Sequence, residues 1–381
     1  MSKPFLFTIF ILFIAGCAYT TKVTDGSTAV ERKQYSVAIP LLKKEFNRAK
    51  LRSEKGKIAN NLALAYEQTG QDEEAETWYL NAYNNGGGTD ALKGRAAALK
   101  RLERYEESIE VYTELGLEIG SRYEFRSQIL GADISRGWLE EKDKAYQVEP
   151  VDFNSKQADY APVLYRNGQL VISSDRSAAT GDGTYAWTGG GFSDLFLVDP
   201  ESGSVNSFDS RLNTEANEGV PTFSAAYDEV IFTRCDATGK REDAFCGLFL
   251  ARRQGDSWSL PERLPFVENK VNYLHPALSA DGNTLYYSAK TENGWGGYDI
   301  YEVQRTAENT WGEPKLLNRS INSQGNEQFP FLDGDTLYFA SDGLVGMGGL
   351  DIYKVYKMQN GSYSSPKNLK PPLNSGADDF G

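Results

Sequence analysis

Between residues 27 and 146 the apolar residues recur with the period of an α-helix. Residues 57–87 put small and aromatic residues on one face of each of two successive helices, namely Ala59, Leu62, Ala63 and Tyr66, then Ala75, Tyr79 and Ala82. A similar unit follows 33 residues later, with Ser108 in the place of Ala75. Small residues let paired helices approach closely, so the pattern predicts an all-α solenoid of stacked helix pairs.

After residue 147 the apolar runs become short, as in β-strands. Proline precedes four of these runs at intervals of 59, 55 and 54 residues, at Pro162, Pro221, Pro276 and Pro330. Further runs begin 52 or 53 residues apart, at Asp194, Gly247, Asp299 and Asp351. Four strands in each unit of about 54 residues, with Asp-Gly turns, are typical of propeller blades. We therefore predict a multidomain chain, with the all-α solenoid over residues 27–146 and an all-β propeller of four-stranded antiparallel blades over residues 147–381.

An acid follows a glycine pair in two of these units, in "GWGGYDIYEV" and "GMGGLDIYKV". Such an acid could bind a metal or take part in catalysis, or it could accept backbone hydrogen bonds in a turn. Gly247 stands at this place in the second unit. Since a required ligand or base would not be dropped, the pattern favours a structural turn.

The last residues, "LNSGADDFG", repeat the segment that introduces each earlier blade. We therefore expect four complete blades and the start of a fifth, within a longer protein. Residues 146–155, "YQVEPVDFNS", are predicted to form the last strand of a blade that precedes the first.

The N-terminus has the pattern of a bacterial export signal. After Lys3 comes an apolar run of about a dozen residues, which is too short to span a bilayer. The residues "FIAG" before Cys17 resemble a lipobox, although a chance match or a buried membrane-anchor cysteine remains an alternative. This pattern predicts a lipoprotein signal peptide at 1–16, a lipid anchor on Cys17 and a tether at 17–26. Because Ala18 and not Asp follows, we expect the periplasmic face of the outer membrane.

In that oxidising compartment Cys235 and Cys246 form an even pair, which favours a disulfide. Free thiols or a metal pair are the alternatives, but the chain has no histidine nearby.

The chain has 40 Lys and Arg against 53 Asp and Glu, a formal net charge of −13, so nucleic acid is an unsuitable partner. Its single histidine, His275, precedes Pro276 at the start of a strand. Nucleophile-elbow, zinc-protease and phosphate-loop motifs are lacking. We accordingly predict no catalytic residues, no metal, no cofactor and no enzymatic activity. A hydrolase that needs only two carboxylates is the alternative.

The helix pairs resemble tetratricopeptide repeats, whose concave surface binds proteins. By this resemblance that surface carries Lys57, Asn60, Leu64, Glu67, Asp90, Lys93, Ala97 and Lys100. A Gly-rich insertion, residues 175–192, carries Tyr185 and Trp187, which either contact a partner or fold back on the blade edge.

The order of lipobox, helix repeats and WD-repeat-like blades resembles the Bacteroidota lipoproteins of the OmpA family, some of which serve the type IX secretion machinery. The resemblance implies a periplasmic scaffold for envelope proteins, including secretion-system components. It implies peptidoglycan contact only through a C-terminal module that this sequence does not include. A glycan- or peptidoglycan-binding or hydrolysing propeller is the alternative.

Overall fold

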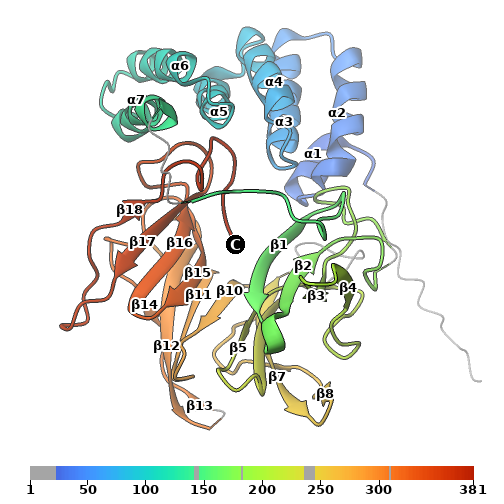
Figure 1. The fold of residues 1–381 in the computed structure, drawn as a ribbon. Coiled ribbons are helices and arrows are strands. Elements are labelled where there is room, and N and C mark those ends of the chain that lie inside the picture. Colours follow the sequence, from blue (N-terminus) through green and yellow to red (C-terminus); the bar gives the residue numbers. More distant parts are fainter. Residues whose placement is uncertain (1–22, 141–145, 182, 236–244, 309) are drawn as a thin grey trace, which may run out of the picture.

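The computed structural model describes residues 23–140, 146–181, 183–235, 245–308 and 310–381. Within these residues seven helices precede four antiparallel β-sheets, which are the blades of a four-bladed β-propeller (Figure 1). The predicted fold class, an all-α region followed by an all-β propeller with four-stranded antiparallel blades, is thereby confirmed. Cys17 and the expected signal at 1–16 lie outside the described residues.

In the helical region each helix packs against the next one in sequence. The helices are α1 (Gly26–Glu31), α2 (Tyr35–Arg48), α3 (Arg52–Glu67), α4 (Asp72–Asn84), α5 (Gly88–Arg101), α6 (Tyr105–Glu118) and α7 (Arg126–Glu140). Ala63, Ala75 and Ala82 are fully buried between them, as the small-residue pattern predicts. Across the described residues, every helix is too short or too polar to cross a membrane.

Each blade is an antiparallel sheet of four strands in sequence order, and in blades 2 and 3 a short fifth strand pairs with the third strand. Blade 1 contains β1 (Asp159–Leu164), β2 (Leu170–Ser174), β3 (Asp194–Asp199) and β4 (Ser204–Ser207). Blade 2 contains β5 (Asn217–Phe223), β6 (Glu229–Cys235), β7 (Cys246–Gln254), β8 (Ser257–Trp258) and β9 (Glu262–Arg263). Blade 3 contains β10 (Asn272–Leu278), β11 (Thr284–Lys290), β12 (Asp299–Ala307), β13 (Thr310–Trp311) and β14 (Lys315–Leu316). Blade 4 contains β15 (Glu327–Asp333), β16 (Thr336–Ser341), β17 (Asp351–Tyr356) and β18 (Lys367–Asn368).

The recurring proline marks a bulge in the first strand of every blade. Proline cannot donate a hydrogen bond to a ladder, and the strand register shifts at this point in all four blades. The residue before each proline has a positive φ, between 49° and 54°: Ala161, Val220, His275 and Phe329. The repeat of 54 to 59 residues that the sequence displays is therefore the repeat of this bulge.

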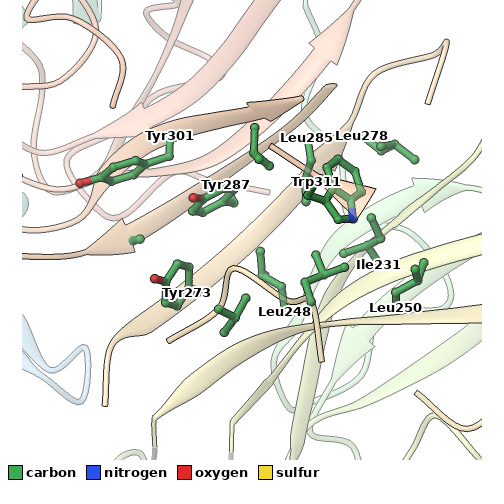
Figure 2. Close-up of a cluster of buried hydrophobic side chains, with 13 residues drawn as sticks. Ile231, Leu248, Leu250, Tyr273, Leu278, Leu285, Tyr287, Tyr301 and Trp311 are labelled. Atoms are coloured by element: carbon green, nitrogen blue, oxygen red, sulfur yellow. The ribbon is translucent and has the colours of Figure 1, made fainter. Parts of the chain in front are cut away.

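Apolar side chains from adjacent blades form the propeller core. Figure 2 shows one cluster, in which Ile231, Leu248 and Leu250 of blade 2 meet Leu285 and Trp311 of blade 3. Similar clusters join blade 1 to blade 2 and blade 3 to blade 4. This packing holds the loops at either end of the propeller in fixed places.

The prediction of a strand at 146–155 is wrong. These residues pair with no sheet, and Val148 and Val151 are 64% and 45% exposed. Val148 and Val151 are three residues apart, so they would face opposite sides of a strand, and Pro150 between them cannot donate a hydrogen bond to a ladder. At the other end of the chain, Phe380 stacks on Phe329 of β15 at 4.5 Å, and Gly381 lies against Ala161 of β1.

The helical region lies across one end of the propeller (Figure 1). Helices α1 and α2 stand over blade 1, and α5 to α7 stand over blade 4. Contacts at both places, described below, connect the two parts.

Candidate functional site

The acid of the repeated glycine-acid motif caps the turn before the third strand of its blade. Asp299 Oδ2 accepts a hydrogen bond from the backbone N–H of Trp295 at 2.8 Å, and Asp351 Oδ2 accepts one from Met347 at 2.8 Å. Burial raises the pKa of both carboxyls, to about 7 for Asp351, against the effect of these bonds. The local contacts of the motif are thus those of a turn.

A second set of repeated hydrogen bonds lies in the segments that join the blades, which are called joints below. The side-chain amide of Asn322 bonds to both backbone groups of Ile300, as a neighbouring strand would. Its Oδ1 accepts from the N–H of Ile300 at 2.8 Å, and its Nδ2 donates to the carbonyl of Ile300 at 3.0 Å. Glu327 then accepts from the N–H and Oγ of Ser323, at 2.8 and 2.6 Å. The joints with Asn213, Thr214 and Glu218, and with Asn374, Ser375 and Asp379, repeat these bonds.

The insertion at residues 175–192 attaches blade 1 to the helical region. Trp187 Nε1 donates to the carbonyl of Gln68 at 3.1 Å, and its ring meets Tyr35 edge-on with 5.2 Å between centroids. Ser36 Oγ donates to the carbonyl of Ala186 at 2.8 Å. Trp187, predicted as a contact residue, therefore makes a contact within the chain.

Tyr185 has a different place on the same insertion. Its ring packs against Phe192 at 5.5 Å, and burial raises its pKa to about 12. It supports the fold of the insertion next to Trp187.

A second contact connects α5, α6 and α7 with blade 4. Glu103 Oε1 accepts a hydrogen bond from the N–H of Gly376 at 3.0 Å, and Lys370 Nζ lies 5.3 Å from the ring centre of Trp138. Lys100 is buried here, and burial lowers its pKa although the charge of Asp351 opposes this. The helical region is therefore held at both ends.

A groove on the helical region contains most of the predicted protein-binding residues. It has a volume of about 300 Å³ and lies between α3 and α5. Its lining residues include Asn60, Leu64, Glu67, Asp90, Lys93 and Ala97 from the predicted set. Of the other two, Lys57 is exposed outside it, and Lys100 faces Asp351 at the blade 4 contact.

Ion pairs hold one wall of this groove. Arg101 contacts Glu67 at 3.0 Å and Asp72 at 2.6 Å, and Tyr79 donates its hydroxyl hydrogen to Glu67. Burial, together with the Glu67 charge, raises the pKa of Tyr79. The sequence interpretation assigned Tyr79 to the core and missed Arg101, whose partners are 29 and 34 residues away along the chain.

One acceptor in the groove is unused. Asn60 Oδ1 is buried and receives no hydrogen bond from the residues that the structure describes. Because an unpaired buried acceptor is costly, a ligand N–H at this place would stabilise the groove.

Cys235 and Cys246 form a disulfide between the facing ends of β6 and β7. His275 is buried, stacks on Phe329 at 3.7 Å and accepts a hydrogen bond from the Phe329 N–H at 3.3 Å. Burial lowers the pKa of His275 to about 3, so the imidazole is neutral near pH 7. Groups of three or more His, Cys, Asp or Glu side chains fit for a metal are not found in the described part of the chain.

Comparisons with known proteins found one family model and several similar solved structures. A domain of unknown function, DUF6340, matches residues 24–111. No curated protein matches the chain. An α-L-arabinofuranosidase from Lactobacillus brevis is 8% identical over 61% of this chain and 78% of its own, with a TM-score of 0.38.

Two further solved structures are similar over less of their length. TolB from Acinetobacter baumannii is 16% identical over 45% of this chain and 37% of its own, with a TM-score of 0.31. The xyloglucan-locus protein GH43B from Bacteroides ovatus is 14% identical over 57% of this chain and 42% of its own, with a TM-score of 0.37. This chain thus spans less than half the length of either protein.

These comparisons correct one prediction. We expected no enzymatic activity because the usual motifs are lacking, yet the similar structures include arabinofuranosidases and an arabinanase. Glycoside hydrolysis needs only two suitably placed carboxyl groups, so missing histidine and nucleophile motifs do not exclude it. At these TM-scores the matches assign no activity to this chain.

Proposed function

We propose that this chain is a lipid-anchored scaffold that holds envelope proteins at the periplasmic face of the outer membrane, with the α3–α5 groove as its binding site. The observation that carries the proposal is the buried Asn60 Oδ1, which receives no hydrogen bond from the described part of the chain and lies in a groove with exposed Asp90 and Lys93. An extended peptide supplies the N–H groups that such an acceptor needs.

The attachment of the helical region supports a scaffold. Contacts at Trp187 and at Glu103 hold its two ends on the propeller, so a partner in the groove would be held in a fixed place relative to the blades. The tetratricopeptide-like pattern and the OmpA-family resemblance favour secretion-system components, such as those of type IX, as partners.

A crosslinking experiment tests the groove. A photoreactive amino acid at Lys93, which is in the groove, should capture a defined protein in cells, and the same residue at Glu110 on α6 should not. Leu64→Glu places a charge in the groove and should abolish the capture while the protein stays folded. Equal capture at both positions, or capture that survives Leu64→Glu, would contradict the proposal.

A fractionation experiment tests the anchor independently. Cys17→Ser should release the protein from membranes, because a lipidated cysteine is the proposed attachment. Retention of the variant through high-salt washes would refute the lipid anchor. Binding of the purified chain to insoluble peptidoglycan in place of envelope proteins would favour the glycan alternative.

A further inference from the structure

Blade 3 has a cleft that the proposed scaffold role does not use. Its volume is about 710 Å³, compared with about 400 Å³ for the cleft between blades 3 and 4. It is lined by the joint before blade 3, by β10, β11 and β12, and by the turn between β13 and β14. This volume is in the range of clefts that hold small ligands.

Three tyrosines on neighbouring strands form one wall of this tyrosine cleft. Tyr287 pairs with Tyr301 across β11 and β12, and their rings stack with 5.7 Å between centroids at 11°. Tyr273 of β10 lies 5.7 Å from Tyr287. Figure 2 shows their three hydroxyls on the same side, away from Leu285 and Trp311. Phe266 stacks on Tyr287 at 5.4 Å and fixes the ring.

The hydroxyl of Tyr287 differs from that of Tyr301 in its hydrogen bonding. Tyr301 bonds to Thr291 Oγ1 at 2.7 Å, but no hydrogen bond reaches the Tyr287 hydroxyl from the residues described in the structure. Tyr287 is 1% exposed, and burial raises its pKa, so the hydroxyl keeps its proton and can donate. Tyr287 lines the tyrosine cleft, so this hydroxyl is free to bond to a ligand there.

The other blades show what this position requires for folding. Tyr287 lies two residues before the residue that pairs with the turn acid of its blade, or with Gly247 in blade 2. The same position in blades 1, 2 and 4 is occupied by Ile172, Phe232 and Phe339, which have no polar atom. Packing alone therefore does not call for a hydroxyl here.

The first strand of blade 3 departs from the repeat in the same cleft. Tyr273 pairs with Ala289 and takes the place of the joint acid of the other blades. Those acids are Asp159, Glu218 and Glu327. Tyr273 and Tyr287 thus both differ from the residues at the same positions in the other blades, and both line the same cleft.

We propose that the tyrosine cleft binds a neutral saccharide, with Tyr273 and Tyr287 as hydrogen-bonding residues. Hydroxyls can both donate and accept, and the exposed Glu268, Asn293 and Glu313 in the lining add acceptors and an amide donor. This mixture suits sugar hydroxyls, which also donate and accept. The two carboxylates and the net charge of −13 disfavour anionic ligands.

The test compares two adjacent residues that face opposite ways. Tyr287→Phe removes only the free hydroxyl, whereas Tyr286→Phe removes a hydroxyl that bonds to Tyr363 at 2.9 Å in the cleft on the other face of β11. The full chain, purified in a detergent without a sugar head group, is titrated by calorimetry with cellotetraose, xylotetraose, mannotetraose and maltotetraose.

At least one of these saccharides should bind the unchanged protein. Tyr287→Phe should weaken that binding about tenfold, the effect of one lost hydrogen bond, and Tyr286→Phe should leave it unchanged. Thermal unfolding shows that both variants are folded. Failure of all four saccharides to bind, or equal binding by Tyr287→Phe, would overturn the proposal. Binding of a lysine-rich peptide instead, abolished by Glu313→Gln, would assign the cleft to cationic peptides.

Discussion

Replacing Trp187 with alanine should detach the helical region from blade 1 while leaving its attachment to blade 4. Trp187 provides the indole hydrogen bond to Gln68 and the edge-on contact with Tyr35. The hydrogen bonds of Ser36 to the insertion remain at this end after the change.

The expected loss of unfolding free energy follows from the contacts of Trp187. The hydrogen bond contributes about 1 kcal/mol and the aromatic pair about 0.5–1.5 kcal/mol. Burial of roughly half of the indole surface contributes about 2–3 kcal/mol at about 25 cal/mol per Å². Since Trp187 is only partly buried, we expect Trp187→Ala to lower the free energy of unfolding by roughly 4 kcal/mol. Trp187→Phe, which keeps a ring, should lower it by about 1–2 kcal/mol.

Distances between spin labels report the detachment directly. A pair at the exposed residues Lys44 of α2 and Ser202 of blade 1 should change from a narrow to a broad distance distribution in the Trp187→Ala variant. A second pair, at Glu110 of α6 and Lys367 of β18, should stay narrow because the blade 4 contact is intact.

The matched control is Trp295→Ala, which removes a 40% exposed tryptophan that contacts blade 3 residues. It should leave both label pairs narrow. If Trp187→Ala keeps the first pair narrow and changes the unfolding free energy by less than about 1 kcal/mol, the insertion is not an attachment point and the reasoning fails.

Three further predictions concern titration and covalent structure. The imidazole of His275, the sole histidine, has a pKa lowered to about 3 by burial, so its NMR signal should not titrate between pH 8 and 5; a midpoint near 6.5 would contradict this. Because unfolded histidine takes up a proton below its pKa of about 6.5, His275 should also make stability fall as pH falls through that value. Asp351 acts in the opposite direction: burial raises its pKa from 3.8 to about 7, so its contribution to stability is present at low pH and is lost as pH rises from about 4 to 7. Urea unfolding at pH 4.5 and 7.5 should show that Asp351→Asn removes up to about 3 kcal/mol of the difference in unfolding free energy between the two pH values, and an unchanged difference would refute the shift. Replacing Cys235 and Cys246 with serine should lower the unfolding free energy by up to about 3 kcal/mol, measured by urea unfolding, and alkylation of both cysteines without prior reduction would show that the disulfide is not formed.

The blade strands were predictable because each blade repeats the same local requirements. A proline forces the bulge of the first strand, and an acid caps the turn before the third strand, so residues such as Pro276 and Asp299 appear at fixed intervals. The helix pairs were predictable because Ala63 and Ala75 are small where helices meet.

The attachment of the helical region was not predictable in the same way. Trp187 and Gln68 are 119 residues apart, and each lies in a segment that occurs once. Without a repeated pattern, only the three-dimensional arrangement shows that they meet. The groove is an intermediate case, because the resemblance to tetratricopeptide repeats implied most of its lining while the ion pairs of Arg101 were missed.

Because the blades repeat, a residue of one blade can be compared with the residues at the same position in the other blades. In blade 2, Gly247 replaces the turn acid, and the residue that pairs with it is Arg234, whose guanidinium binds Glu218 at 2.7 Å. The ion pair of Arg234 with Glu218 thus compensates for the missing turn acid. In blade 3, the hydroxyl of Tyr287 stands where the other blades are apolar, and no residue described in the structure uses it. Since neither packing nor a hydrogen bond within the described residues accounts for this hydroxyl, a ligand is the better explanation of the departure in blade 3.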